Sequence, residues 1–442
     1  MTPQAPPMRG AMITAILCFG SLGVGVAGCR QSATPPAAVT ILDPEWSQPD
    51  EMPRAEREAQ EFTEETGVAV KHLPVPETSL GQLDLLRGLL GQGASGPDVV
   101  GIDVIWPGIL ADDLVDLRPD FSAELAALDP DLVAGYTVSG KVVAVPYHAH
   151  VGVLAYRTDL LREYGYAHPP KTWDELEKMA LRIQSGERAK GKKDFWGYTW
   201  QGAAAESLTC NALEWQVADG GGRIIEDDKT ISVNNPAAIH AWQRAARWVG
   251  WISPPGVVAY RELDTMNVWN TGGTAFRRTW QWKYRLTHWE ESAMAKKTGF
   301  TSMPGGVAGR VGTLGGIGLG VSRFSVHRKE AVALIRFLVD REHQSGADRA
   351  PSAQFSPPEL YELPAVLDPH GESNAAIEER GKVISRPSNI TGAQYEDVTK
   401  AYIQAVHSVL VREKSGPNAA AALEKQLASI TGFKTGPPKK AH

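Results

Sequence analysis

Residues 97–108 have the sequence Pro-Asp-Val-Val-Gly-Ile-Asp-Val-Ile-Trp-Pro-Gly. The part from Asp98 to Val104 is a short β-rich run, which predicts a strand of a sheet. Asp103 lies inside a run that is otherwise apolar and ends in Trp106, and burial of its carboxylate costs free energy unless it meets a partner. The stretch therefore predicts a strand that carries a polar group for which the rest of the chain must supply a partner.

Strands and helices alternate on the N-terminal side of this stretch. Two apolar runs predict strands, and two segments with helical periodicity predict helices, the first of them closed by Gly67 as a C-terminal cap. The predicted strands are 39–42 and 68–73, and the predicted helices are 54–66 and 80–90. Alternation of this type indicates a mostly parallel sheet flanked by helices.

A second series of strands and helices follows a proline-marked transition. Tyr136 to Pro146 predicts a hairpin around Ser139-Gly140, and His148 to Tyr156 continues as an extended segment. Helix starts are marked by a capping box at Thr172 and by the pair Asn235-Pro236. Later segments predict two strands, 273–279 and 314–321, and a helix, 332–339. We therefore expect two α/β lobes joined by extended crossovers, with the ligand in the interlobe cleft.

The N-terminal 28 residues are typical of a secretory signal peptide. They contain one charged side chain, Arg9, and then an uncharged, mostly apolar run that ends Val26-Ala27-Gly28-Cys29. The run approaches the length of a membrane span, but its glycines and its ending favour an exported segment over a transmembrane anchor. The ending resembles the bacterial lipobox, which implies cleavage before Cys29 and lipidation of its thiol. Residues 30–38 form a polar, proline-containing linker.

Composition and missing motifs argue against several classes of function. The 442 residues carry a formal net charge of −6 without a basic stripe, so nucleic acid is not expected as a ligand. The motifs G-x-S-x-G and H-E-x-x-H and a phosphate-binding loop are missing, and Cys210 has no evident base, so neither catalysis nor a cofactor is expected. Paired carboxylates like those of glycosidases are not excluded by spacing alone. A lipidated Cys29 would leave Cys210 without a disulfide partner in the mature chain.

Six segments, in order along the chain, resemble signature stretches of the maltose/trehalose-type extracellular solute-binding proteins (family 1) of ABC importers. They are PDVVGIDVIWPG at 97–108, GVLAYRTDLL at 152–161, PPKTWDEL at 169–176, WQGAAAESLTC at 200–210, ISPPG at 252–256 and TLGG at 313–316. The resemblance implies the bilobal type II periplasmic-binding fold, in which the chain crosses between the lobes more than once. It also implies a binding protein rather than an enzyme.

On this resemblance, the protein is expected to be the substrate-binding component of an ABC transporter that captures a sugar, a trehalose- or maltose-like disaccharide or a small oligosaccharide. Its partners would be the permease subunits and, through them, the ATPase. We expect an exported monomer, lipid-anchored on the outer face of the cytoplasmic membrane or in the periplasm. The expected domains are a signal peptide (1–28), the lipidated cysteine and linker (29–38), an N-terminal lobe (39–147 and 314–350), a C-terminal lobe (148–313 and 351–434) and a disordered tail (435–442).

Sugar binding needs planar hydrogen-bonding groups for pairs of hydroxyls and aromatic faces for the C–H surface of the sugar ring. Asp103 is a candidate acceptor for two sugar hydroxyls, with a structural carboxylate that caps a loop or helix as the alternative. Trp280 and Trp282 follow the predicted strand 273–279, and alternate residues of a strand share a face. Both rings are candidates for the cleft, where the family has an aromatic pair, although most of the 13 tryptophans are expected in the core.

The resemblance adds further candidate ligand contacts. Glu45 and Trp46 follow the first strand. Trp200 and Glu206 lie in the segment with the closest match, and Arg386 falls where the family has an arginine that reaches the cleft. For the middle pair, packing is the alternative explanation. Gly315 and Gly316 would let backbone amides approach a ligand closely.

Two departures from the family bear on the identity of the sugar. Its members usually have an aromatic residue and then an acid where this chain has His148 and His150. They also usually have a tryptophan where this chain has Ile317, which removes one stacking face. Histidine both donates and accepts, so a sugar is compatible with these changes if the preference among hydroxyls is altered.

The same two histidines are the basis of an alternative function, capture of a metal ion for uptake. Two residues apart on an extended chain, His148 and His150 face the same way and could share one ion. Such a site needs two more ligands, for which His72, Asp103 and Glu45 are conceivable.

Overall fold

The computed structural model describes residues 38–44, 46–47, 52–76, 78–91, 93, 96–128, 130–280, 294, 297–344 and 381–439, and the structural statements below refer to these residues. The predicted signal peptide, Cys29 and most of the linker lie outside them. In the described part of the chain, no helix combines the length and the apolar composition that crossing a membrane requires.

The strands and helices predicted for the N-terminal part are confirmed. In chain order they are β1 (Ala38–Leu42), α1 (Met52–Thr66), β2 (Ala69–His72), α2 (Ser79–Gly91) and β3 (Val99–Asp103). β1 pairs in parallel with both β2 and β3. α1 ends where expected because Gly67 adopts a φ of 74° and donates its N–H to the carbonyl of Thr63.

Short elements connect β3 to the rest of the sheet. They are α3 (Pro107–Leu110), the 3-10 helix η1 (Ala111–Asp113), α4 (Ser122–Ala127), α5 (Pro130–Gly135), β4 (Thr137–Val138) and β5 (Lys141–Val142). β4 and β5 form the predicted hairpin, with Ser139 and Gly140 both at positive φ in its turn.

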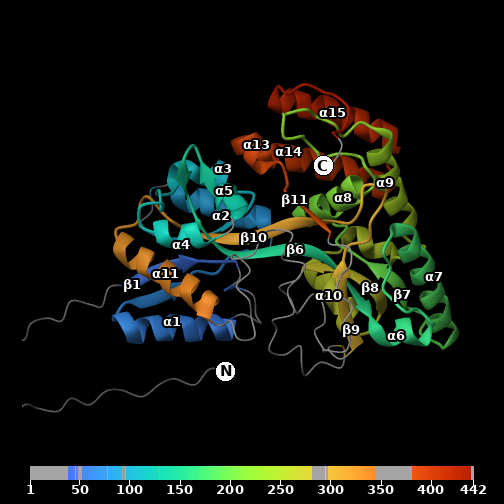
Figure 1. Cartoon of the computed structure of the whole chain (residues 1–442), viewed down its shortest axis with the longest axis horizontal. Helices are drawn as coiled ribbons and strands as arrows, with labels where there is room; N and C mark the ends of the chain where they lie inside the picture. Colours follow the sequence, from blue (N-terminus) through green and yellow to red (C-terminus); the bar gives the residue numbers. More distant parts are fainter. Residues whose placement is uncertain are drawn as a thin grey trace, which may run out of the picture. The chain divides into compact units, whose positions relative to one another are not determined.

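Two long strands, β6 (Val145–Arg157) and β10 (Val311–Val321), run through the middle of the sheet (Figure 1). The strand order is β2-β1-β3-β10-β6-β8-β7, where β7 is Trp196–Thr199 and β8 is Thr274–Trp280. β9 (Thr298–Ser302) also pairs with β6, and β11 (Lys382–Ile384) pairs with β10. The sheet is mixed rather than mostly parallel, because β10 is antiparallel to β3 and β6, and β6 is antiparallel to β8 and β9.

Most of the remaining helices lie around the second half of the sheet, while the short helical segments at 388–394 contact α3. In chain order these elements are α6 (Thr158–Glu163), α7 (Trp173–Ala189), α8 (Glu206–Ala218), α9 (Pro236–Trp248), the 3-10 helix η2 (Pro255–Ala259), α10 (Glu262–Asn270), α13 (Ser388–Thr391), the 3-10 helix η7 (Gly392–Gln394), α14 (Tyr395–Leu410) and α15 (Gly416–Thr431). Both predicted helix starts are confirmed. Thr172 accepts from the N–H of Glu175, and Asn235 accepts from two N–H groups of α9. The Glu175 carboxylate accepts from the N–H of Lys171 instead of that of Thr172, so the second hydrogen bond of the capping box is made to the residue before the N-cap.

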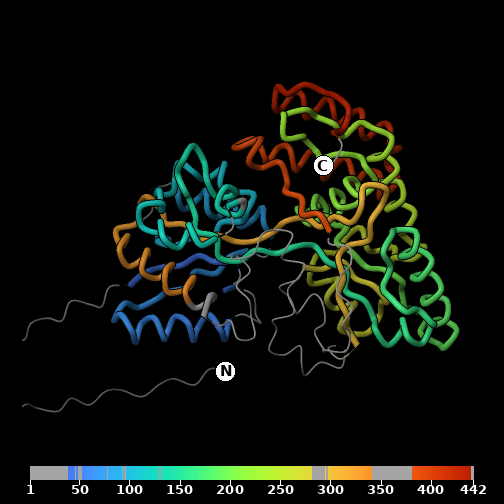
Figure 2. The backbone as a smooth tube through the Cα atoms, in the orientation of Figure 1, coloured from blue at the N-terminus to red at the C-terminus, as the bar shows by residue number. Residues whose placement is uncertain are grey.

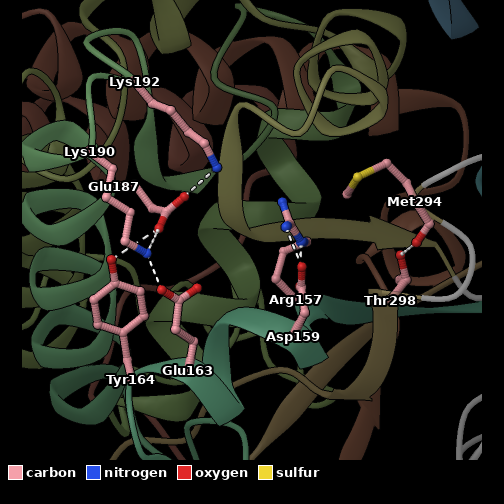
Figure 3. Close-up of polar contacts among 9 residues, drawn as sticks. All are labelled: Arg157, Asp159, Glu163, Tyr164, Glu187, Lys190, Lys192, Met294 and Thr298. Carbon is pink, nitrogen blue, oxygen red and sulfur yellow. Dashed lines mark hydrogen bonds and ion pairs between the residues drawn. The ribbon is translucent and has the colours of Figure 1, made fainter.

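A polar cluster ties α6 to α7 on the outside of this half (Figure 3). The buried carboxylate of Glu187 accepts from the hydroxyl of Tyr164 at 3.0 Å and from Lys190 at 2.8 Å, and Lys192 donates to its other oxygen. Burial alone would raise the pKa of Glu187, but the bonds from the two lysines outweigh it and lower the pKa to about 2. Every donor in this cluster has a partner within it, so the cluster is explained by its structural role.

The buried hydrophobic residues gather into separate cores, which define two lobes. The N-terminal lobe, completed by α11 (Arg328–Gln344), holds two adjoining clusters, and the C-terminal lobe holds the largest one. β6 contributes Val145 to the first lobe and Leu154 to the second, and β10 contributes Val311 to the second and Leu319 to the first. The chain therefore passes between the lobes within each of these strands, as the continuous tube in Figure 2 shows.

The described C-terminal residues lie against the C-terminal lobe. Thr435 forms a bridge with Ile231, and the N–H of Gly436 donates to the carbonyl of Ile231. Lys439 then pairs with Asp228 at 2.6 Å. Residues 435–439, expected from their composition to belong to a disordered tail, are thus held by backbone pairing and a surface ion pair; Lys440 to His442 lie outside the described residues.

An aromatic cluster forms the centre of the C-terminal core. The ring of Trp248 lies 5.5 Å from that of Trp173, 5.6 Å from that of Tyr198 and 5.6 Å from that of Trp215. All four side chains are buried, and the indole N–H of Trp248 donates to Glu177 at 2.6 Å. The contacts with Tyr198 and Trp215 are edge-to-face, and such contacts add to the free energy of burial.

We predict that Trp248→Ala lowers the free energy of unfolding by about 3–5 kcal/mol, because it leaves a cavity among rings that have no room to collapse. Trp251→Ala, three residues later at a ring that is 40% exposed, is the control and should cost less than about 1 kcal/mol. Urea denaturation followed by circular dichroism measures both values. Equal losses for the two variants would contradict the central place of Trp248.

Candidate functional site

The middle of β10, where the chain passes between the cores, is where several predicted site residues meet. Ile317 pairs with Asp103 of β3 on one side and with His148 of β6 on the other. Two residues earlier, Gly315 pairs with His150. The register of three strands therefore brings predicted contacts from distant parts of the sequence to one place in the sheet.

The paired glycines of β10 permit close packing at this place. Gly316 has a φ of 144°, and a Cβ there would lie 2.2 Å from the carbonyl oxygen of His148. Its own carbonyl accepts from the N–H of Val104, at 3.1 Å. A Cβ at Gly315 would lie 3.0 Å from the indole ring of Trp280. Both glycines thus have a packing role, one toward the β6 backbone and one toward a tryptophan ring.

Asp103 ends β3 with its side chain partly exposed, at 21%. Its Oδ1 accepts from the N–H of Ile105 at 3.2 Å and lies 3.6 Å from Nη2 of Arg386. Burial raises the pKa of Asp103, Arg386 lowers it and the carboxylate of Glu206 raises it again, to about 6. The carboxylate is therefore ionised at neutral pH, but by a small margin.

Arg386 and Glu206 form the centre of a buried charge network. Nη1 of Arg386 donates to Oε1 of Glu206 at 2.9 Å, and Nη2 donates to the carbonyl of Leu314 on β10 at 3.2 Å. Glu206 also accepts from Tyr395 at 2.5 Å and from Thr399 at 2.7 Å. Burial disfavours the charge of Arg386, yet the acidic groups around it hold its pKa well above the usual range. Its Nε is buried without a partner among the described residues.

Trp280 ends β8 with a partly exposed ring. The guanidinium of Arg278 lies over that ring, 4.0 Å from its centre. Arg278 is fully buried and is paired with Glu214, whose two oxygens accept from it at 2.7 and 3.2 Å. The ring therefore has a fixed neighbour, and the residue as a whole is partly exposed.

His148 and His150 are more than nine-tenths buried on β6. Their rings lie 5.9 Å apart and 18° from parallel, and the ring of Tyr147 lies 3.8 Å from that of His148. The two histidines do share a face, as the alternation along a strand predicts. Within the described ranges, no group of three or more histidine, cysteine or acidic side chains is arranged to hold a metal ion.

Two of the predicted tryptophans lie away from this place. Trp46 is buried in the N-terminal core, 6.0 Å from the ring of His72. Trp200 is fully buried in the C-terminal core, 4.9 Å from Trp215, and its N–H donates to Ser253. In this conformation neither ring offers surface to a ligand. Glu45 and Trp282 lie outside the described residues, as does Cys29.

Sequence reasoning missed Arg278, Glu214 and Tyr395. One local signal existed, because Arg278 lies two residues before Trp280 on the same strand and so shares its face. The other contacts join residues 64 and 189 positions apart, and no local pattern marks them.

The arrangement is suited to binding rather than to reaction. It offers a partly exposed carboxylate, a buried guanidinium with a spare donor and an aromatic ring, which are groups for hydroxyls and C–H surfaces. Cys210 lies close to this charge network, but burial raises the pKa of its thiol to about 12, so it is not a nucleophile at neutral pH.

Comparisons with known proteins agree with this description. The family model of the bacterial extracellular solute-binding proteins matches residues 46–345. A Deinococcus radiodurans protein named "Probable ABC transporter-binding protein" is 40% identical over 378 residues, which are 85% of this chain and 89% of that protein.

Solved structures give the same fold. Maltose-bound MalE3 of T. maritima has a TM-score of 0.77 at 30% identity and covers 89% of this chain and 100% of its own. A solute-binding protein of Thermotoga lettingae bound with alpha-D-tagatose has a TM-score of 0.75 at 20% identity, covering 90% of this chain and 99% of its own. The predicted bilobal periplasmic-binding fold is confirmed. The chain belongs to the bacterial extracellular solute-binding proteins, and it is the substrate-binding component of an ABC transporter, not an enzyme.

Proposed function

We propose that this protein captures a sugar between its lobes, a disaccharide or small oligosaccharide, and delivers it to the permease of an ABC importer. One observation carries the proposal. Asp103 of β3 pairs with Ile317 of β10, and the ring of Trp280 from β8 lies against Gly315, so residues from different lobes lie beside the two ends of one β10 segment. A hydrogen-bond acceptor next to an aromatic face is what a sugar ring requires.

Each group has a distinct role in this proposal. Asp103 accepts bonds from a pair of hydroxyls, while Trp280 covers the C–H face of a sugar ring. Arg386 holds Asp103 in place and offers its Nε, and Glu206, which lies in the lobe opposite Asp103, anchors Arg386. The histidines of β6 lie along the same part of the sheet and supply groups that can both donate and accept.

The sugar that we propose as the ligand is a maltose-like glucoside. MalE3, at 30% identity, was solved with maltose bound. Ile317 is almost buried between β3 and β6, where a tryptophan was expected from the family, and among the described residues Trp280 supplies an aromatic side chain nearby that is partly exposed. Capture of a metal ion is not favoured, because the solved structure at 30% identity has maltose bound and no group of three or more histidine, cysteine or acidic side chains in the described ranges is arranged to hold a metal ion.

The location of the protein follows from its N-terminal residues. Cleavage after Gly28 and lipidation of Cys29 would hold the lobes at the outer face of the cytoplasmic membrane, near the permease. The linker from Arg30 onward then supplies the reach between the anchor and β1.

We predict that thermal unfolding of residues 30–442 shifts upward with maltose-like sugars and not with zinc or manganese. A ligand at about 100 times its dissociation constant adds roughly 2.7 kcal/mol, which is a shift of a few degrees at this size. A panel of mono-, di- and trisaccharides with the two metals as controls identifies the ligand class. A shift with metal alone would overturn the sugar proposal.

Asp103 should give sugar binding a pH dependence. Its pKa is about 6, so lowering the pH from about 7.5 to about 5 protonates about nine-tenths of the carboxyl groups. Because the ionised form is the stronger acceptor, affinity should be nearly full above about pH 7, fall to about half at pH 6 and be reduced by up to about tenfold at pH 5. Calorimetric titration of the sugar across this range measures the effect.

Asp103→Asn should bind more weakly at neutral pH, by about 1.5–3 kcal/mol, and should lose most of the pH dependence. Asp98→Asn is the matched control, at the residue that directly precedes the same strand. Its carboxylate accepts from Thr40 and Ser325, so the change should lower stability and leave sugar affinity unaltered. A pH profile that survives Asp103→Asn would assign it to another group.

We also predict that the protein isolated from membranes of its native host, or expressed with a lipoprotein-processing system, begins at a lipidated Cys29. Mass spectrometry of the N-terminal peptide tests this. A mature chain that begins before Cys29, or that carries a free thiol there, would refute the anchor, and Cys29→Ala provides the unlipidated control.

A further inference from the structure

Trp280 is partly exposed at the proposed sugar site, and two described neighbours lie against its ring. Arg278 lies over the ring with its guanidinium carbon 4.0 Å from the ring centre. Gly315 of the neighbouring region of β10 lies so close that a Cβ would come within 3.0 Å of the ring. A cation at this distance attracts the π-face of an indole, so the contact has a preferred geometry.

The orientation of Arg278 is itself fixed. Glu214 of α8 accepts from Nη2 at 2.7 Å and from Nε at 3.2 Å, a two-bond fork that leaves the guanidinium plane one orientation. The same carboxylate accepts from the N–H of Thr313, at 3.1 Å, two residues before Gly315. Glu214 therefore ties α8, β8 and β10 together directly behind the ring.

The strand beside this pair has no side chain where one would interfere. Gly152 of β6 pairs with Trp280, and a Cβ there would lie 2.0 Å from Oε1 of Glu214 and 2.7 Å from Nη2 of Arg278. The ion pair is fully buried, and desolvation of two charges offsets most of their attraction. Apolar side chains of the same volume would stabilise the lobe at least as well, so stability alone does not account for a charged pair here.

We propose that the buried Arg278–Glu214 pair is a positioning device that fixes the ring of Trp280 and thereby sets which sugars the site accepts. A ring held at one angle accepts sugars whose apposed face carries only C–H groups. It rejects epimers with an axial hydroxyl on that face, because the hydroxyl would be buried against carbon without a partner. The selectivity part of this inference rests on the proposed sugar-binding function, while the positioning part concerns the free protein.

The test uses the double variant Arg278→Met/Glu214→Gln, which keeps the packing volume and an acceptor for Thr313 but removes both charges. The matched control is Arg244→Met/Asp219→Asn. That pair is also buried in the C-terminal lobe, with an ion-pair distance of 2.6 Å, and Arg244 lies over the ring of Trp248 rather than that of Trp280. Arg278→Lys, which retains a charge opposite Glu214 without the planar fork, serves if the double variant does not fold.

Two measurements separate positioning from stability. Fluorine NMR of protein labelled with fluorotryptophan, with the Trp280 signal assigned by Trp280→Phe, reports the ring in the free protein. Calorimetric titration with the best sugar and with its epimer carrying an axial hydroxyl reports affinity and selectivity. We expect the Trp280 signal to shift and broaden in the double variant, with affinity reduced about tenfold and selectivity reduced with it. The control should leave the signal and both affinities as in the unmodified protein.

An unchanged Trp280 signal in the double variant, and in Arg278→Lys, would overturn the positioning role. A changed signal with unchanged affinity and selectivity would overturn the role in sugar recognition. If the unmodified protein binds no sugar but the Trp280 signal responds as expected, the positioning role stands and the proposed function fails.

Discussion

β6 and β10 run antiparallel through both lobes, and each strand is buried in one hydrophobic core at one end and in the other core at the opposite end. Their pairing is tight at Gly316, whose missing side chain lets the two backbones approach. Everything proposed for the site lies beside this pairing. β3 joins it from one lobe with Asp103, and β8 joins it from the other with Trp280. A change in the relation of the two strands would move these two side chains relative to each other.

The two carboxylates next to Arg386, those of Glu206 and Asp103, differ in how many hydrogen-bond donors they meet. Glu206 receives three side-chain donors, so most of its acceptor capacity is used. Asp103 accepts one backbone bond and lies at a longer ion-pair distance from the same arginine. Asp103 is partly exposed and has acceptor capacity left, so it is suited to a ligand. Glu206 is buried among its three donors, so it is suited to a structural role. Arg386 thus connects a structural acid in one lobe to an available acid in the other.

Burial distinguishes the aromatic candidates in the same way. Trp200 and Trp46 are enclosed by their cores, where they contribute packing. Trp280 lies at the end of its strand, and the buried guanidinium of Arg278, not an apolar side chain, lies over its ring. A charged pair at such a position adds little to stability, because desolvation costs nearly what the attraction returns. Trp200 and Trp46 therefore stabilise the cores, whereas Arg278 positions the ring of Trp280 for the proposed ligand.

The sequence by itself determined the elements: the first strands and helices, the capped starts at Thr172 and Asn235, and the two-lobe architecture follow from periodicity and caps, which are local properties. It also singled out Asp103, because a carboxylate in an apolar run is conspicuous. Only the tertiary structure decided that the sheet is mixed and that Trp200 belongs to the core. It also decided that Glu214 pairs with Arg278 and that Arg386 pairs with Glu206, although the partners are far apart in the sequence. The physical reason is that strand direction, burial and ion pairing are set by which distant segments meet, and no local pattern in the chain records that.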